Sequence, residues 1–453
     1  MQKPPSKSLR WFALGALLAA PACAGFGGTP PSAVGMRVAA LRPNTSPIQH
    51  VVIVIQENRS FNDLFMGYPG AVTQSYGYDT NGEKIALRGQ PMATYWDIDH
   101  SSQGFFAACD GRGKLPGTYC KMDGWNREHA GYGRPNNFAY AYVPENEIAP
   151  YWGMAEQYVL ADHMFASNLD GSFVAHQYAV AAYASHSVDY PKSDWGCRGG
   201  KQDTVATLTE QRTYGKHIEV CFSYPTIASE ADGAGLSWRF YAGAPQGDGG
   251  IWSAYQADRA IYYGKDWKNN VIDPPSQFLT DVGAGRLANI TWITPTYENS
   301  DHAGFDANGG PAWVASVVNA VGESKFWKTT AIFIFWDDPG GWFDPVPPVH
   351  EDYDGLGFRV PLIVISPFAK HGKVTHVQYE TASVLRFVED NFGLAPLGAS
   401  DKRAHDPVGD ALDYHQAPRA FKPIRGSQPN RYWIERDRAF TRRGPPATMI
   451  GSD

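Results

Sequence analysis

The sequence between residues 48 and 65 reads Ile48-Gln49-His50-Val51-Val52-Ile53-Val54-Ile55-Gln56-Glu57-Asn58-Arg59-Ser60-Phe61-Asn62-Asp63-Leu64-Phe65. The apolar, β-branched run from Val51 to Ile55 predicts a fully buried strand at the centre of a parallel sheet. The run ends abruptly at Glu57-Asn58. Ligands of open α/β sheets bind beyond the carboxyl ends of the strands, and a carboxylate next to an amide offers oxygen ligands to a divalent metal. A polar junction between strand and loop, without chemistry, is the alternative interpretation.

Polar clusters follow two later strands in the same way. Asn289 to Thr294 predicts a short strand, and Ser300-Asp301-His302 comes soon after it. Ala331 to Trp336 predicts another buried strand, which ends in the adjacent carboxylates of Asp337 and Asp338. Two neighbouring carboxylates repel each other, and a bound cation relieves that repulsion. A solvated strand end is the alternative for this pair.

A candidate nucleophile stands at the start of a predicted helix. Gly171-Ser172 precedes Phe173 to Tyr183, a segment of helical composition. The first turn of a helix has free N–H groups and the positive end of the dipole, which attract an anion. The same groups stabilise the negative charge that develops when a hydroxyl attacks phosphate. A simple N-cap is the alternative role of Ser172. We expect His176, one turn further along, to pack within the helix layer.

The composition describes a globular protein. The chain has 453 residues, 43% of them hydrophobic and 19% charged, so it is long enough to bury a large core. The formal net charge of −7 gives no support to nucleic-acid binding. Besides Cys23 there are four cysteines, which allow three pairings. Proximity favours Cys109–Cys120 and Cys197–Cys221; a zinc site is the competing interpretation, although no Cys-x-x-Cys spacing is present.

The N-terminus has the pattern of a secretory signal peptide over residues 1–22. It combines a positive region, an apolar stretch and a cleavage sequence: Lys3, Lys7 and Arg10, then Trp11 to Ala20, then Ala20-Pro21-Ala22. We therefore expect a secreted or periplasmic protein, with a lipid anchor on Cys23 as the less favoured alternative. The apolar stretch is too short to span a bilayer, and no later segment is long enough. We expect no transmembrane segment, while peripheral contact with a membrane is compatible with the sequence.

Composition also divides the rest of the chain. Residues 23–47 are rich in Gly, Pro, Ser and Ala and predict a flexible leader. A catalytic domain is expected over 48–425, with loop-rich cap insertions at about 66–145 and 185–285. Apolar periodicity predicts helices over Pro150 to Val159, Ala312 to Val321 and Tyr379 to Phe392. Residues 398–453 lose periodicity, and their arginines make the end basic, so we expect a loosely packed tail over 426–453.

Several segments resemble motifs of the bacterial phosphoesterase family, which contains phosphatidylcholine-type phospholipases C and related acid phosphatases. They occur in the family's order: Glu57-Asn58-Arg59-Ser60-Phe61, Asp97-Ile98-Asp99-His100-Ser101, Lys121-Met122-Asp123-Gly124, Gly171-Ser172-Phe173 with His176-Gln177-Tyr178, Ser300-Asp301-His302, Asp337-Asp338 with its glycine-rich turn, and Gly357 to Phe368. The resemblance implies an α/β fold with an alkaline-phosphatase-like core: a mostly parallel central sheet flanked by helices on both faces, with loop-rich cap insertions.

The resemblance also implies a mechanism. Ser172 would be the covalent nucleophile, and one divalent metal ion would be bound by four residues: Glu57, Asn58, Asp337 and Asp338. Carboxylate and amide oxygens suit Ca²⁺, Mg²⁺ or Mn²⁺, and nearby imidazoles would allow Zn²⁺. His100 and His302 would bind phosphate oxygens and assist the leaving group. Lys121 is a further expected substrate contact. His376 could reach the site from a loop, and a structural role is the equal alternative for it.

The expected substrate is a phosphate ester, with phospholipid head groups first and an acid-phosphatase-like phosphomonoesterase as the alternative. A third interpretation is a secreted binding protein with an inactive site. The presence of the acidic residues and the serine of the expected site argues against it. One departure from the family stands out. Where the family has Asp-His-Val-Pro-Pro, this chain reads Asp344-Pro345-Val346-Pro347-Pro348, which puts the contribution of that histidine in doubt. His350 is the nearby candidate to replace it.

Overall fold

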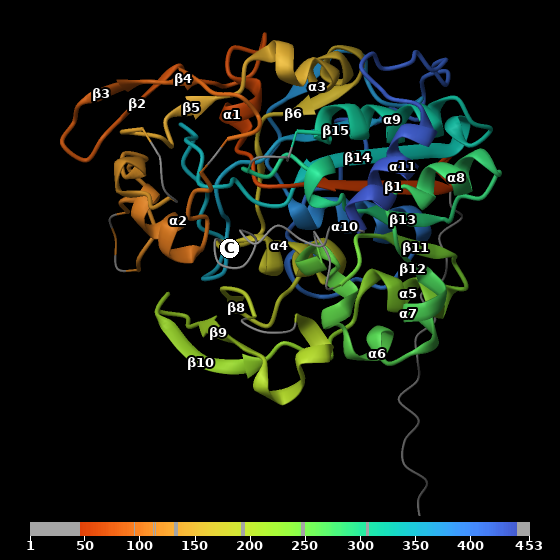
Figure 1. The fold of residues 1–453 in the computed structure, drawn as a ribbon, viewed down its shortest axis with the longest axis horizontal. Helices are drawn as coiled ribbons and strands as arrows, with labels where there is room; N and C mark the ends of the chain where they lie inside the picture. Colours follow the sequence, from red (N-terminus) through yellow and green to blue (C-terminus); the bar gives the residue numbers. More distant parts are fainter. Residues whose placement is uncertain are drawn as a thin grey trace, which may run out of the picture. The chain divides into compact units, whose positions relative to one another are not determined.

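The strand predicted from Val51 to Ile55 is β1 (His50–Gln56), and it lies inside a central sheet (Figure 1). The structure is a computed structural model, and all that follows concerns the unit Leu41–Asp453. The described residues are 46–94, 96–111, 113, 115–130, 135–191, 195–245, 250–304 and 308–441. The expected signal peptide, Cys23 and nearly all of the expected leader therefore lie outside the described residues. Among the helices that the structure describes, none has both the length and the apolarity needed to cross a bilayer.

The central sheet has eight strands within the described residues. In spatial order they are β12 (Val271–Ile272), β11 (Trp238–Tyr241), β13 (Ile290–Ile293), β1, β14 (Thr330–Trp336), β15 (Leu362–Ile365), β6 (Val159–Ala161) and β16 (Lys373–Thr375). All neighbouring pairs are parallel except those that involve β15, which runs against β14 and β6. The expected α/β architecture with a mostly parallel sheet is confirmed.

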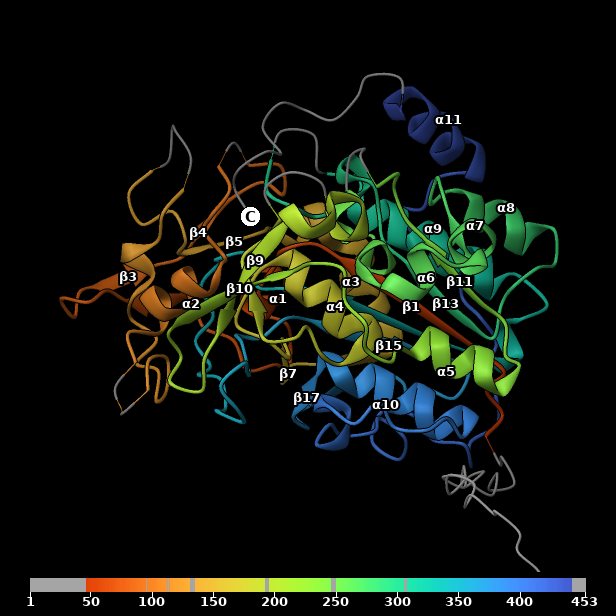
Figure 2. The same ribbon diagram turned by 90° about the horizontal axis from the view of Figure 1, so that it is seen from below.

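Helices cover both faces of this sheet (Figure 2). On β14, Phe333 contacts Phe387 of α10, whereas Trp336 contacts Tyr151 of α3. Because side chains alternate along a strand, positions three apart point to opposite faces. The helices are α1 (Phe61–Phe65), α2 (Ser102–Cys109), α3 (Glu145–Gln157), α4 (Ser172–Ala181), α5 (Ile227–Ala234), α6 (Arg259–Tyr262), α7 (Lys265–Asn270), α8 (Gln277–Gly283), α9 (Gly310–Gly322), α10 (Thr381–Phe392) and α11 (Asn430–Thr441).

The three helices predicted from periodicity are present as α3, α9 and α10. The first begins earlier than predicted, at Glu145, and accommodates Pro150 because Ile148, just before it, leaves helical geometry. The third begins at Thr381, because Tyr379 and Glu380 form the short strand β17 (Tyr379–Glu380) beside β7 (Met164–Phe165). It ends at Gly393, whose φ of 68° is the left-handed conformation expected of a helix stop.

The first expected insertion, 66–145, carries short strands and one longer helix instead of a single irregular loop. Its paired strands are β2 (Tyr76–Tyr78) with β3 (Lys84–Ala86) and β4 (Arg88–Gly89) with β5 (Ala141–Tyr142). The insertion shares an apolar cluster with later parts of the chain, in which Trp125 packs on Phe343 and Phe358. The disulfide Cys109–Cys120 closes one of its loops, as predicted.

The second expected insertion, 185–285, is only partly an insertion. Its first half forms an antiparallel sheet of β8 (Ser187–Val188), β9 (Thr204–Leu208) and β10 (Tyr214–Glu219), next to the predicted disulfide Cys197–Cys221. Its second half supplies β11 and β12, which extend the central sheet beyond β13. The expectation of a separate cap over the whole range is therefore wrong. Both strands are short, so they leave a weak periodic signal in the sequence.

The expectation of a loosely packed C-terminal tail is wrong for the residues described up to 441. Helix α11 packs beside α8 and α9 through Trp433, which is 1% exposed and contacts the ring of Trp313. The Trp433 indole donates to Ser316 Oγ at 2.8 Å, and Asp437 accepts from the backbone of Ser276. The helix is polar on most of its surface, which is why periodicity did not reveal it.

Replacing Trp433 by alanine is expected to destabilise the protein by about 3–5 kcal/mol, because it removes a buried aromatic side chain and leaves a cavity. Replacing the adjacent Tyr432, which is 42% exposed, should change stability far less. Urea unfolding of the two variants and the wild type measures the difference. Equal stabilities of the two variants would mean that α11 is not anchored by Trp433.

Candidate active site

Glu57, Asn58 and Asp337 meet because β1 and β14 are adjacent parallel strands. Gln56 is the register partner of Trp336, so the residues that follow these strands emerge side by side. The Asn58 backbone N–H donates to Asp337 Oδ1 at 3.0 Å. All three side chains are at most 1% exposed. The sheet therefore brings together two strand ends that are separated by 279 positions in the sequence, as predicted.

The backbone after these two strands has left-handed conformations at Asn58 and Gly340. Asn58 has a φ of 57°, a left-handed conformation that asparagine tolerates better than most residues. Gly340, in the turn after Asp338, has a φ of 60°, and a Cβ at this position would lie 2.0 Å from the Asn58 carbonyl oxygen. Only glycine fits there. The Gly340 N–H donates to Asp338 Oδ1 at 2.7 Å and so orients that carboxylate.

Ser172 is the first residue of α4, and its hydroxyl lies between residues of both strand ends. Its Oγ is 3.3 Å from Asn58 Oδ1 and 3.3 Å from Asp338 Oδ2. Gly171 occupies the N-cap position without a side-chain cap, so the N-cap interpretation of Ser172 does not hold. The hydroxyl is buried, and it stands at the end of the helix where N–H groups are left without intrahelical partners.

His176 is a residue whose place sequence reasoning missed. Instead of only packing within the helix layer, its Nε2 lies 3.0 Å from Glu57 Oε1 and 3.6 Å from Asp337 Oδ2. One ligand atom from each of these three residues lies within 4.8 Å of the others. The signal was present in the sequence: residues four apart share one helix face, so Ser172 and His176 point the same way.

His100 contacts Asn58 and fixes the orientation of its amide. The His100 Nδ1 donates to the Ile98 carbonyl at 2.6 Å, so Nε2 is left to accept from Asn58 Nδ2 at 2.8 Å. The amide oxygen of Asn58 then faces Ser172. In this arrangement the His100 ring positions Asn58, a neighbour of Ser172, and the phosphate contact expected of His100 stays a prediction.

His302 joins the same region through Asp97. The two imidazole rings of His100 and His302 lie edge to face with centroids 6.1 Å apart. The carboxylate of Asp97 lies 3.9 Å from His100 Nδ1 and 3.9 Å from His302 Nε2, and its buried oxygens have no hydrogen-bond partner among the described residues. A carboxylate at this position complements a protonated imidazole. Asp97 is a second site residue that the sequence reasoning left without a role, although its spacing to His100 was visible.

Two of the expected substrate contacts lie elsewhere. The Lys121 ammonium pairs with Asp110 and with Asp123 at 3.7 Å, in the loop beside the first disulfide. His376 pairs with Asp162 at 2.8 Å, at the end of β16. The structure thus groups neither side chain with Ser172. Both substrate contacts therefore stay predictions, because sequence order alone does not reveal which loop of a large sheet turns towards which strand end.

The family's missing histidine is not replaced by His350, which is exposed. Asp344, the residue before Pro345, is fully buried and forms two hydrogen bonds with Arg359, from Nε at 2.8 Å and from Nη2 at 3.0 Å. Asp344 also accepts from the backbone N–H groups of Asn62 and Val346. The Asp344 segment is therefore anchored by a buried arginine that needs no histidine at position 345.

The residues present fit a divalent metal ion. Glu57 and Asp337 place two buried carboxylates in one group with the His176 imidazole, and the buried carboxylate of Asp338 lies 3.3 Å from Ser172 Oγ, an arrangement that a cation would stabilise. Asp337 Oδ2 has no hydrogen-bond partner among the described residues, although it is buried. Unmatched buried oxygens are costly. Carboxylate, amide and imidazole ligands suit several divalent ions, and the structure does not select one of them.

Asp301, the residue before His302, is fully buried. Its Oδ2 accepts from the Tyr151 hydroxyl at 2.7 Å and from the Trp336 indole at 2.9 Å. Burial raises the pKa of Asp301 to about 7, against the opposing hydrogen bond from Tyr151 and the charge of Arg59. The folded state therefore binds this proton more tightly than the unfolded chain does.

The stabilising effect of that proton is fully present below about pH 4, the unfolded pKa, and is lost as the pH rises through about 7. We expect Asp301→Asn, which cannot titrate, to flatten this dependence by on the order of 1–3 kcal/mol between about pH 5 and 8. Urea unfolding at fixed metal concentration measures it. Parallel pH profiles of wild type and variant would show that Asp301 does not titrate in this range.

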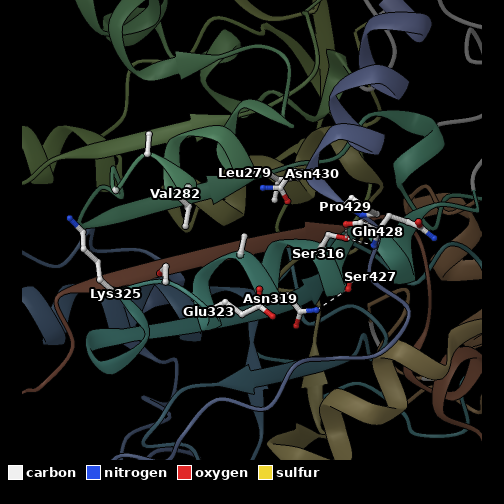
Figure 3. A pocket seen from close by; sticks show the side chains of 15 residues that line it. Leu279, Val282, Ser316, Asn319, Glu323, Lys325, Ser427, Gln428, Pro429 and Asn430 are labelled. Carbon is white, nitrogen blue, oxygen red and sulfur yellow. Dashed lines mark hydrogen bonds between the residues drawn. The ribbon is translucent and has the colours of Figure 1, made fainter.

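Figure 3 shows a surface cavity of about 860 Å³. Its walls come from α8, α9 and residues 427–430, and the Asn319 amide donates to Ser427 Oγ at 2.9 Å within it. None of the residues gathered around Ser172 lines it. The candidate site is therefore identified by the contacts among its own residues and not by this cavity.

Comparison with known proteins agrees with the motifs. Hemolytic phospholipase C of Pseudomonas aeruginosa is 24% identical over 421 residues, covering 79% of this chain and 54% of that enzyme. The chain thus spans about half the length of that relative. Phospholipase C B of Mycobacterium tuberculosis is 23% identical over 436 residues, covering 83% of this chain and 80% of that protein.

A solved structure of an alkaline phosphatase superfamily protein from Vibrio parahaemolyticus matches 78% of this chain and 70% of its own, with a TM-score of 0.37 and 8% identity. The sequence model of the Phosphoesterase family matches residues 48–395, from β1 to just beyond α10. This range contains Glu57, Ser172 and Asp337. The chain therefore belongs to the Phosphoesterase family.

Proposed function

We propose that this protein is a secreted, metal-dependent phosphoesterase that works through a phosphoserine on Ser172 and acts as a phospholipase C on phospholipid head groups. The observation that carries the proposal is the position of the Ser172 hydroxyl, 3.3 Å from Asn58 Oδ1 and 3.3 Å from Asp338 Oδ2. An alcohol at a helix N-terminus and next to a metal-ligand cluster is placed to attack phosphorus.

In the first step, Ser172 Oγ forms a bond to phosphorus while the bond to the leaving alcohol breaks. The hydroxyl proton passes to the carboxylate of Asp338. The departing oxygen takes a proton from His302, whose Nε2 faces Asp97. In the second step, water gives a proton to His302 as its oxygen attacks the phosphoserine, and Asp338 returns its proton to Ser172 Oγ as the Oγ–phosphorus bond breaks. His100 holds the Asn58 amide throughout, so that its oxygen stays directed at Ser172.

The metal would be held by the four predicted residues, Glu57, Asn58, Asp337 and Asp338, with His176 as a further ligand. When bound, such an ion supplies a positive charge that lowers the pKa of the serine hydroxyl and polarises a phosphate oxygen. Glu57 and Asp337 also hold the His176 ring in place through their contacts with Nε2.

The choice of phospholipid rests on the relatives, which are named as phospholipases C. Secretion is supported by the two disulfides, which form in oxidising compartments. Peripheral contact with a membrane follows from a lipid substrate.

The deciding experiment measures hydrolysis of phosphatidylcholine vesicles and of p-nitrophenyl phosphate by one purified preparation, with and without chelator. We expect the larger kcat/KM on the phospholipid and loss of both activities with chelator, restored by a divalent ion. A larger kcat/KM on p-nitrophenyl phosphate would favour the phosphomonoesterase alternative. No turnover of either substrate with any divalent ion would favour a binding protein with a dead site.

A further inference from the structure

A second cluster of metal-binding side chains lies two strands away from β14 on the same edge of the sheet. Strands β6 and β16 are parallel neighbours, and Ala161 is the register partner of Thr375. The residues that follow, Asp162 and His376, therefore emerge side by side. Because β15 runs against both β14 and β6, the strands β14 and β6 point the same way and end at the same edge. This is the edge on which ligands of such sheets bind.

Two imidazoles converge on one carboxylate in this cluster. Asp162 Oδ1 lies 2.7 Å from His163 Nδ1 and 2.8 Å from His376 Nδ1. One ligand atom from each of the three residues lies within 4.8 Å of the others. The two rings stand nearly perpendicular, at 85°, and both Nδ1 atoms lie next to the same oxygen, Asp162 Oδ1. These are the positions that a small ion between them would require, after adjustments of a fraction of an ångström.

The carboxylate is buried and fixed by hydrogen bonds, whereas the imidazoles are accessible. The Asp162 side chain is fully buried, its Oδ2 accepts from the Val72 N–H at 2.7 Å, and its backbone carbonyl accepts from Arg359 at 2.6 Å. Burial alone would raise the pKa of Asp162, but the hydrogen bonds from His163, Val72 and His376 outweigh it and lower the pKa. His163 is 26% exposed and His376 55% exposed, which leaves an entry path and room for a water ligand.

We propose that Asp162, His163 and His376 form a binding site for a zinc-like divalent ion, distinct from the cluster around Ser172. One carboxylate and two imidazoles are the ligand set of Zn²⁺ and its neighbours among the transition metals, whereas Ca²⁺ and Mg²⁺ prefer oxygen ligands alone. Three protein ligands with a fourth position open to solvent allow exchange with the medium. Binding requires each imidazole to carry its proton on Nε2 instead of Nδ1, which the exposed side of each ring permits.

An ion at this position would link the segment after β6 to the segment after β16. Both segments are short and continue into the paired strands β7 and β17. The site therefore assigns to His376 a role in holding these two segments together, in place of the substrate contact predicted from the sequence. Since the ion binds only the folded chain, it adds stability according to its concentration and affinity.

The test uses the mature chain without a histidine tag, depleted of metal and titrated with Zn²⁺ and with Co²⁺. We expect two bound ions in the wild type and one in the double variant His163→Ala/His376→Ala, whose exposed substitutions should not prevent folding. Asp337→Asn should lose the ion near Ser172 and keep the ion bound by Asp162, His163 and His376. His371→Ala, which removes an exposed histidine five residues before His376, is the matched control and should bind two.

The affinity of the second ion should fall by at least about 100-fold in the double variant, together with the zinc-dependent rise in Tm that it causes. Co²⁺ bound there should give the intense visible absorption of a four-coordinate site. Equal zinc binding by the double variant and the wild type would overturn the proposal. Because bound metal is the readout, the outcome is independent of phosphoesterase activity: a wild type that loses its only ion in the double variant would support this site and count against the metal at Ser172.

Discussion

Ser172→Ala is expected to lower kcat on the preferred phosphate ester by at least about 10⁴-fold, the scale on which removal of a covalent nucleophile acts in other hydrolases. The hydroxyl lies against both strand ends, 3.3 Å from Asn58 Oδ1 and from Asp338 Oδ2. Alanine leaves the carboxylates, the amide and the imidazoles in place. The variant should therefore still bind divalent metal and inorganic phosphate, with Kd values within a few-fold of the wild type.

Steady-state kinetics, isothermal titration with phosphate and rapid quenching after mixing with labelled substrate test this expectation. Quenched wild type should carry label on Ser172, and the variant should carry none. Ser75→Ala, which replaces an exposed serine, serves as the control for the substitution itself. Retention of full activity by Ser172→Ala would remove the nucleophile assignment, whereas loss of both activity and phosphate binding would indicate a structural role for Ser172.

The second large effect is expected from Asp337→Asn. Loss of this carboxylate should reduce metal affinity and kcat/KM by more than about 100-fold, because changes even in the outer partners of metal ligands cost 10- to 100-fold. Asp337 Oδ2 lies 3.6 Å from His176 Nε2 and has no hydrogen-bond partner among the described residues. The neutral amide also relieves repulsion with the Glu57 carboxylate.

Two readouts separate a metal ligand from a merely structural residue. Without metal, Asp337→Asn should be at least as stable as the wild type in thermal unfolding, because one buried negative charge is gone. With metal, the wild type should gain stability and the variant should not, and excess metal should partly restore the variant's activity. Glu323→Gln, on an exposed residue, is the charge-matched control. A variant that is unstable without metal yet binds metal normally would contradict the ligand role.

Local sequence was sufficient to predict the strand ends of the site. Val51 to Ile55 and Ala331 to Trp336 are so uniformly apolar that each could only be a buried strand, and the polar residues after them had to lie at a sheet edge. The position of Ser172 at a helix start could be predicted as well, because Gly171-Ser172 directly precedes a segment of helical composition. These features depend on near neighbours in the sequence, and the structure places Glu57, Asn58, Ser172, Asp337 and Asp338 in one cluster.

The tertiary structure alone decided the partners of the other residues. Lys121, His376 and Asp97 all stand in loops, and the direction in which a loop turns depends on packing with segments far away in the sequence. His376 was expected near the phosphate and instead meets Asp162, because β16 pairs with β6 at the far end of the sheet. Helix α11 was missed since only a few of its side chains are buried, and they are buried by α9, more than a hundred residues earlier.

The sequence by itself thus determined the α/β class, the buried strands and the chemistry available at their ends. The three-dimensional structure decided which of those ends meet, through the order and direction of the strands. The physical reason is that a strand's burial is fixed by its own side chains, whereas strand pairing depends on hydrogen bonds between backbones, which are chemically alike in every residue except proline.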